Sequence, residues 1–181
     1  MIAVLPLAII SMTALPFDNR TASGETHNAS GKCEQITAHV DLCSLPPNWQ
    51  QVPSENPYAV RQFHSDNDFF AQVLIENAGE EQGLTLKGAT DSILAGMERQ
   101  PSASEFVVLM RGTNPAYNFN SEVVLFSVKL DGIPFVYAET IIVGAKHNIQ
   151  FVTWRIASEP TVDDRAAHLE FGNSFQMLSS F

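Results

Sequence analysis

The residues best suited to hold a metal ion stand close together in one short polar segment. His64, Asp66 and Asp68 occupy alternate positions there. An imidazole and two carboxylates are ligands for divalent cations, and His147 or Glu76 could complete the set. The same segment also suits an ordinary turn, because Asp and Asn side chains accept hydrogen bonds from nearby backbone groups. A metal site, or a metal-assisted hydrolase built on it, is therefore the alternative to a solvated turn.

A second group of residues has the composition of a recognition surface. The ten-residue stretch 111–120 presents Arg111, Asn114, Tyr117 and Phe119. Arginine and aromatic side chains are enriched where proteins contact other molecules, and loops commonly carry them. The two rings could instead close one end of a sheet. We take the four residues as candidates for binding.

The motifs of common enzyme classes are missing from the sequence. The ten glycines are scattered and form neither a phosphate-binding loop nor a serine nucleophile elbow, and no HExxH zinc motif is present. The two cysteines stand beside Glu34 and Asp41, whose negative charge disfavours a reactive thiolate. We expect a protein that is not an enzyme and has no cofactor.

Whether Cys33 and Cys43 pair depends on how the nine residues between them fold. Those residues alternate apolar and polar and contain no Gly, Pro or Asn, which is typical of a strand. Ten strand steps would hold the cysteines about 33 Å apart, whereas a disulfide needs Cα atoms about 5.5 Å apart. The pattern favours free thiols. A chain that is extended only from Ala38 onward would allow Cys33 to fold back and pair.

The N-terminus resembles an export signal. Residues 2–15 are uncharged and apolar, about as long as the core of a signal peptide and too short to span a bilayer. We interpret residues 1–23 as a signal peptide, residues 24–37 as a polar linker and residues 38–181 as one domain. The alternative is a buried N-terminal helix or strand. We expect an exported protein, periplasmic or secreted, with no stable membrane insertion once the leader is removed.

The net charge of the chain limits the classes of molecule that it can bind. Twenty acidic and ten basic residues give a formal net charge of −10 over 181 residues. A nucleic-acid binder would need clustered Lys and Arg. We therefore expect no nucleic acid, and a protein partner or a small apolar ligand of unknown identity.

The elements that must position these residues can be placed from periodicity. We expect strands at 39–45, 58–63, 69–75, 106–110, 123–130, 133–143 and 149–157. Asp131-Gly132 predicts a tight hairpin turn. Apolar residues at helical spacing predict a helix over 85–99 with Thr85 as its N-cap. A final helix should begin near Pro160, with Thr161 and Asp164 as a capping box and an apolar stripe from Ala167 to Leu178.

The order of these elements is similar to that of a known superfamily. The stretch Leu45-Pro-Pro-Asn-Trp49 follows the first strand, and a strand over 151–158 leads into the helix of EPTVDDRAAHLEFGNSF. Over about residues 38–180 the chain resembles the Mog1/PsbP-like superfamily and, by its exported context, the bacterial periplasmic DcrB-like members. The resemblance implies an α+β fold, with a predominantly antiparallel sheet and helices on both faces. It also implies binding or assembly rather than catalysis, and it assigns no site residue.

Overall fold

The computed structural model describes residues 33–54, 56–77, 85–113, 120–144 and 147–178. The expected leader, residues 24–32 of the expected linker, and the binding candidates Asn114, Tyr117 and Phe119 lie outside these ranges. Two helices are present in the described part: α1 (Leu86–Glu98) and α2 (Val162–Gly172). The strands are β1 (Glu34–Gln35), β2 (Val40–Leu42), β3 (Trp49–Val52), β4 (Ala59–Ser65), β5 (Phe70–Asn77), β6 (Ala103–Thr113), β7 (Ser121–Leu130), β8 (Ile133–Val143), β9 (His147–Ile156) and β10 (Phe175–Met177).

Seven strands form one antiparallel sheet in the order β3-β4-β5-β9-β8-β7-β6. The expected meander β6-β7-β8-β9 is its larger half. At the predicted hairpin, Asp131 and Gly132 take φ values of 50° and 80°, the left-handed conformation that such a turn requires. β9, the last strand of this meander, pairs with β5 over eight residues, from Phe70 opposite Trp154 to Asn77 opposite His147. This pairing joins the two halves of the sheet.

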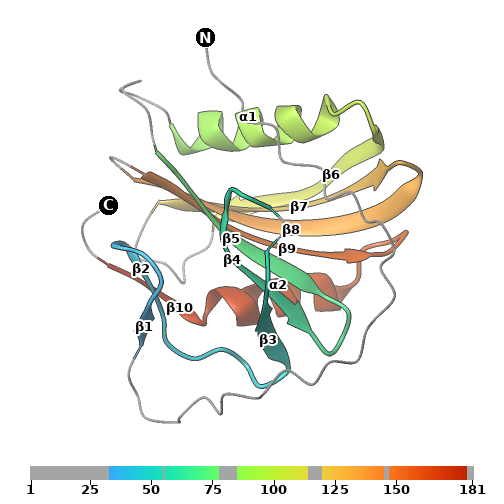
Figure 1. Ribbon diagram of the computed structural model, residues 1–181. Coiled ribbons are helices and arrows are strands. Elements are labelled where there is room, and N and C mark those ends of the chain that lie inside the picture. The colour runs from blue at the N-terminus through green and yellow to red at the C-terminus, as the bar shows by residue number, and fades with distance from the viewer. Residues whose placement is uncertain (1–32, 55, 78–84, 114–119, 145–146, 179–181) are drawn as a thin grey trace.

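One helix covers each face of the sheet (Figure 1). Because side chains of a strand alternate between faces, β9 contributes to two separate cores. Phe151 packs with Phe171 of α2, and Trp154 packs in the same cluster as Met97 of α1. The expected α+β fold with helices on both faces is confirmed.

The ends of the helices follow from local chemistry, with one correction. Thr85 caps α1, accepting from the Gly88 backbone N–H at 3.1 Å. The predicted capping box of α2 forms, and Asp164 accepts from the Thr161 backbone N–H at 2.6 Å. However, α2 ends at Gly172 and Phe175 lies in β10, so the apolar stripe expected to reach Leu178 is wrong. Glycine is a poor helix former, and the residues beyond it pair with β2 instead.

The preference for free cysteines is also wrong, because Cys33 and Cys43 form a disulfide. The chain turns between β1 and β2, and the register places Glu34 opposite Leu42. Thr37 makes this turn without Gly, Pro or Asn: its hydroxyl accepts from the backbone N–H groups of His39 and Val40, both at 3.1 Å. Hydroxyl side chains can replace backbone partners in this way.

The disulfide belongs to a small second sheet of order β1-β2-β10, seen beside the end of α2 in Figure 1. Residues 33–37, placed at the end of the linker by the sequence analysis, form β1 and part of its turn.

Neither helix in the described ranges is long and apolar enough to cross a membrane.

Candidate binding groove

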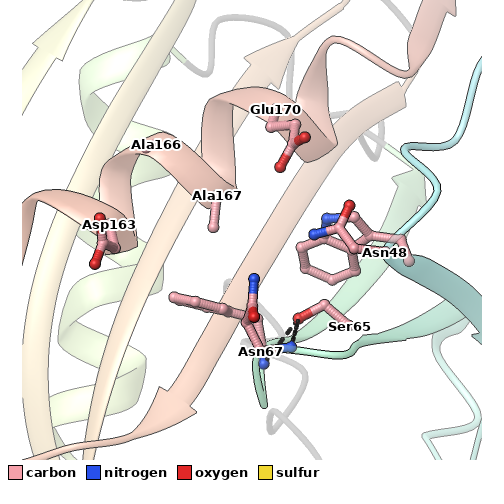
Figure 2. Close-up of a pocket in the computed structure, with 9 residues that line it drawn as sticks. Asn48, Ser65, Asn67, Asp163, Ala166, Ala167 and Glu170 are labelled. Carbon is pink, nitrogen blue, oxygen red and sulfur yellow. Dashed lines mark hydrogen bonds between the residues drawn. The ribbon is translucent and has the colours of Figure 1, made fainter.

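A groove of about 330 Å³ lies between α2 and the turn that joins β4 to β5. Figure 2 shows its two walls, with side chains of α2 on one side and those of the turn and the residue before β3 on the other. Its lining residues are Asn48, Trp49, Ser65, Asn67, Phe69, Asp163, Ala166, Ala167 and Glu170.

The helical wall is one stripe of α2. Asp163, Ala166, Ala167 and Glu170 follow the spacing i, i+3, i+4, i+7, which places them on a single face. The small side chains of the two alanines leave space in the middle of this stripe. The carboxylates at its ends are two turns apart, or about 10 Å along the helix axis. The next face of α2 is buried and carries Asp164, His168 and Phe171.

The opposite wall is a tightly held turn. The Ser65 hydroxyl accepts from the backbone N–H groups of Asn67 at 3.3 Å and Phe69 at 3.1 Å. Asp68 takes a left-handed φ of 61°, which closes the turn. The Asp66 N–H donates to the Asn48 carbonyl at 2.9 Å and fixes the turn against the segment before β3.

Arg155 of β9 contacts both walls of the groove. Its guanidinium donates to both carboxylate oxygens of Asp164 in α2, at 2.6 Å and 2.9 Å. It also lies 5.7 Å from the centre of the Phe69 ring, which lines the groove. A bidentate arginine pair restricts both partners geometrically, so the separation of the walls is set before any ligand arrives.

The three candidate metal ligands of this turn, His64, Asp66 and Asp68, do not line the groove. Phe63 of β4 contacts Phe171 of α2, so the alternate residue His64 faces the other side, where its ring lies 4.7 Å from that of Phe70. Asp66 and Asp68 are exposed in the turn. Within the described ranges, no group of three or more His, Cys, Asp or Glu side chains is arranged to hold a metal ion. It is Ser65, Asn67 and Phe69 that face the groove.

Of the four binding candidates, Arg111 is the one that the structure describes, and its charge is already neutralised. The guanidinium contacts Glu122 at 2.8 Å and Asp91 of α1 at 2.7 Å. Hydrogen bonds from Lys87 and Arg111 lower the pKa of Asp91, so this carboxylate stays charged beside the guanidinium. The arrangement fastens α1 to the β6–β7 pair.

Two buried titratable groups lie outside the groove. Glu139 is 4% exposed, and its Oε1 has no hydrogen-bond partner in the described part. Burial raises the pKa of Glu139 to about 8, and the nearby Glu76 carboxylate adds to the rise. His168 lies between the hydroxyls of Thr140 at 2.7 Å and Thr153 at 2.9 Å, and burial lowers its pKa to about 4. Both groups are therefore uncharged in the core at neutral pH.

The sheet order and the two helices can be compared with solved structures. The cyanobacterial PsbP protein CyanoP from Synechocystis sp. PCC 6803 superposes with a TM-score of 0.57 at 15% identity, covering 77% of this chain and 86% of that chain. The chain has a Mog1/PsbP-like fold. LpqN of Mycobacterium tuberculosis, described as involved in cell envelope biogenesis, has a TM-score of 0.54 at 15% identity, covering 83% of this chain and 87% of LpqN.

Comparison by sequence finds less. No protein-family model matches the chain, and no curated protein matches it. At 15% identity the similarity to CyanoP and LpqN concerns the fold and not the groove. The compartment is indicated by the molecule itself, because a disulfide such as Cys33–Cys43 is typical of proteins outside the reducing cytoplasm.

Proposed function

We propose that this protein is an exported, non-catalytic binding domain, periplasmic or secreted, that takes a partner or ligand in the groove between α2 and the β4–β5 turn. The observation that carries this proposal is the groove itself, whose two walls both contact Arg155 and whose lining offers amides, carboxylates and aromatic rings. Concave sites with a few fixed polar groups are the usual form of ligand sites.

Two further features support the location. The Cys33–Cys43 bond suits an oxidising compartment, and the apolar residues 2–15 suit an export signal. LpqN, which shares the fold, is described as involved in cell envelope biogenesis. A non-catalytic role agrees with the missing enzyme motifs and with the separation of His64 from the groove.

The test is to fill the groove. Ala166 is exposed on α2 and lines the groove, so Ala166→Phe should occupy the space without disturbing the core. Val162→Phe is the matched control, because Val162 is 85% exposed on the same helix and does not line the groove. A partner captured from the exported fraction by the wild type and by Val162→Phe, and lost with Ala166→Phe, supports the proposal. If Ala166→Phe still captures the partner, the partner does not bind in the groove and the proposal is wrong.

A further inference from the structure

β6 is a long strand whose outer edge is open. It runs over eleven residues, Ala103–Thr113, at one end of the seven-stranded sheet, and its neighbour there is β7. Across the part of the chain that the structure describes, residues 104–113 make no backbone–backbone hydrogen bond outside this sheet. Alternate N–H and C=O groups of such a strand point away from the sheet and are able to pair with another strand. The opposite edge strand, β3, is four residues long.

The side chains of β6 make this edge apolar. Val107, Val108 and Leu109 are consecutive, and they are 49%, 39% and 41% exposed. The other large hydrophobic side chains that are exposed in the described ranges stand singly along the chain. Sheet edges are commonly protected by Lys, Pro or a short length, and β6 has none of these features. Its two bulges, between Ser104 and Val107 and between Val108 and Met110, add twist but leave the three side chains exposed.

The charges at the two ends of this apolar segment are of opposite sign. Glu105 precedes it and Arg111 follows it. Although each forms an ion pair within its own chain, the Glu105 side chain remains 66% exposed and that of Arg111 30% exposed. A second copy of β6 laid antiparallel along the first brings the acidic end of each strand to the basic end of the other. A parallel copy would place like charges together, which is unfavourable between neighbouring strands.

We propose that two copies of this protein associate through their β6 edges, as an antiparallel pair related by a twofold axis. The backbone groups of each edge then pair with those of the other, and Val107, Val108 and Leu109 lose surface exposed to water, which is favourable. A twofold axis uses the same surface on both copies, so neither β6 edge stays open. Because each chain carries a net charge of −10, the copies repel each other at long range. We expect a weak dimer, with a dissociation constant on the order of 100 µM.

This surface is separate from the groove. No residue of β6 lines the groove between α2 and the β4–β5 turn, and β6 lies at the opposite end of the sheet from β3 and β4. Pairing of two β6 strands would therefore leave the groove accessible. The inference does not depend on the proposed function, and the two are tested by different variants.

The experiment measures the mass of the full-length protein by sedimentation equilibrium from about 10 µM to about 1 mM, which brackets the expected dissociation constant. The wild type should pass from monomer to dimer. Val108→Lys places a charge in the middle of the apolar segment and should raise the dissociation constant at least about tenfold. Val162→Lys is the matched control, because Val162 is 85% exposed on α2, away from β6, and should leave the constant within about twofold.

Hydrogen exchange locates the contact on the strand. Raising the protein concentration from about 10 µM to about 1 mM should slow exchange of the outward-facing β6 amides about fourfold, since most chains are then dimeric. The amides of β3, the other edge, should keep their rates. Val108→Lys is expected to melt close to the wild type because it changes an exposed position. If it unfolds instead, Leu109→Lys, also at an exposed position, takes its place.

Contrary results are distinguishable. A wild type that stays monomeric at about 1 mM overturns the inference. So does association that persists unchanged in Val108→Lys and Leu109→Lys, which would run through another surface, or protection of β3 in place of β6. If the wild type stays monomeric while a synthetic peptide of residues 103–113 slows exchange of the β6 amides, the edge accepts a strand from a different chain and the self-pairing is wrong.

Discussion

The buried Glu139 should make the stability of the protein depend on pH. Its pKa is near 8 in the folded protein and near 4.5 when exposed. Between these values the folded protein keeps a proton that the unfolded chain releases, so the free energy of unfolding falls as the pH rises from about 4.5 to 8. Glu139→Gln should remove this contribution and stabilise the protein more at pH 8 than at pH 5, as measured by urea denaturation.

The comparison of variants isolates this one group. His168 acts in the opposite direction between about pH 6.5 and 4 because its pKa is lowered, but it is common to the wild type and to Glu139→Gln. Glu98→Gln, which changes an exposed carboxyl on α1, should leave the wild-type pH profile intact. A Glu139→Gln profile that is parallel to the wild-type profile would contradict the assignment.

At the scale of single elements, the N-terminus of α2 depends on Asp164. This residue accepts from Thr161 to cap the helix and forms the bidentate pair with Arg155. Asp164→Ala should lower the free energy of unfolding by about 2–4 kcal/mol, since it removes a cap and leaves a partly buried arginine unpaired. Asp163→Ala, one residue earlier and exposed, should cost less than about 1 kcal/mol. Equal costs in thermal and urea denaturation would show that the Arg155–Asp164 pair does not stabilise α2.

The disulfide should protect the small sheet rather than the whole protein. Cys33→Ser/Cys43→Ser removes a constraint worth about 2–3 kcal/mol for a loop of this length. Because β1, β2 and β10 form their own sheet, we expect their amide hydrogens to exchange on the order of 50-fold faster in the variant. The amides of β8, at the centre of the large sheet, should keep their wild-type rates. Faster exchange throughout would mean that the two sheets unfold together.

The elements that the sequence predicted well are those with a local cause. Asp131-Gly132 specifies its turn through backbone conformation, and Thr85 and Asp164 mark helix starts through hydrogen bonds within a few residues. The missed strands β1, β3 and β10 are two to four residues long and exist because a partner strand lies beside them. No short-range pattern encodes such pairing, and Thr37 made a turn that its sequence neighbours did not suggest.

The groove could be predicted only in part, for a similar reason. Residues 64–68 were recognised as a polar turn, whereas Phe69 was assigned to the following strand, and the stripe from Asp163 to Glu170 can be read from helical spacing. Which turn residues face the groove depends on the alternation of β4, which places Phe63 and Ser65 on the α2 side and His64 on the other. The turn and the helix face each other because both pack against Arg155. This tertiary contact could not be predicted from the sequence.

At the scale of the whole molecule, we predict that folding does not require the N-terminal segment. The two buried clusters are built from residues between Ile36 and Met177. A chain beginning at Gly24 should therefore be folded and soluble, with a melting temperature within a few degrees of the full chain. Mass spectrometry of the protein from its native source should find the leader removed. If deleting residues 2–15 unfolds the protein, the signal-peptide interpretation is wrong and the segment belongs to the core.

The small sheet also determines how the protein would respond to mechanical force. β1 and β10 flank β2 and both run antiparallel to it, so the described chain begins and ends at opposite ends of this small sheet. If the ends were pulled apart, tension entering at Cys33 would pass through the disulfide directly to Cys43. The weakest connection in its path would then be the three-residue ladder between β2 and β10. Stretching would release β10 first and leave the seven-stranded sheet, with both helices, intact.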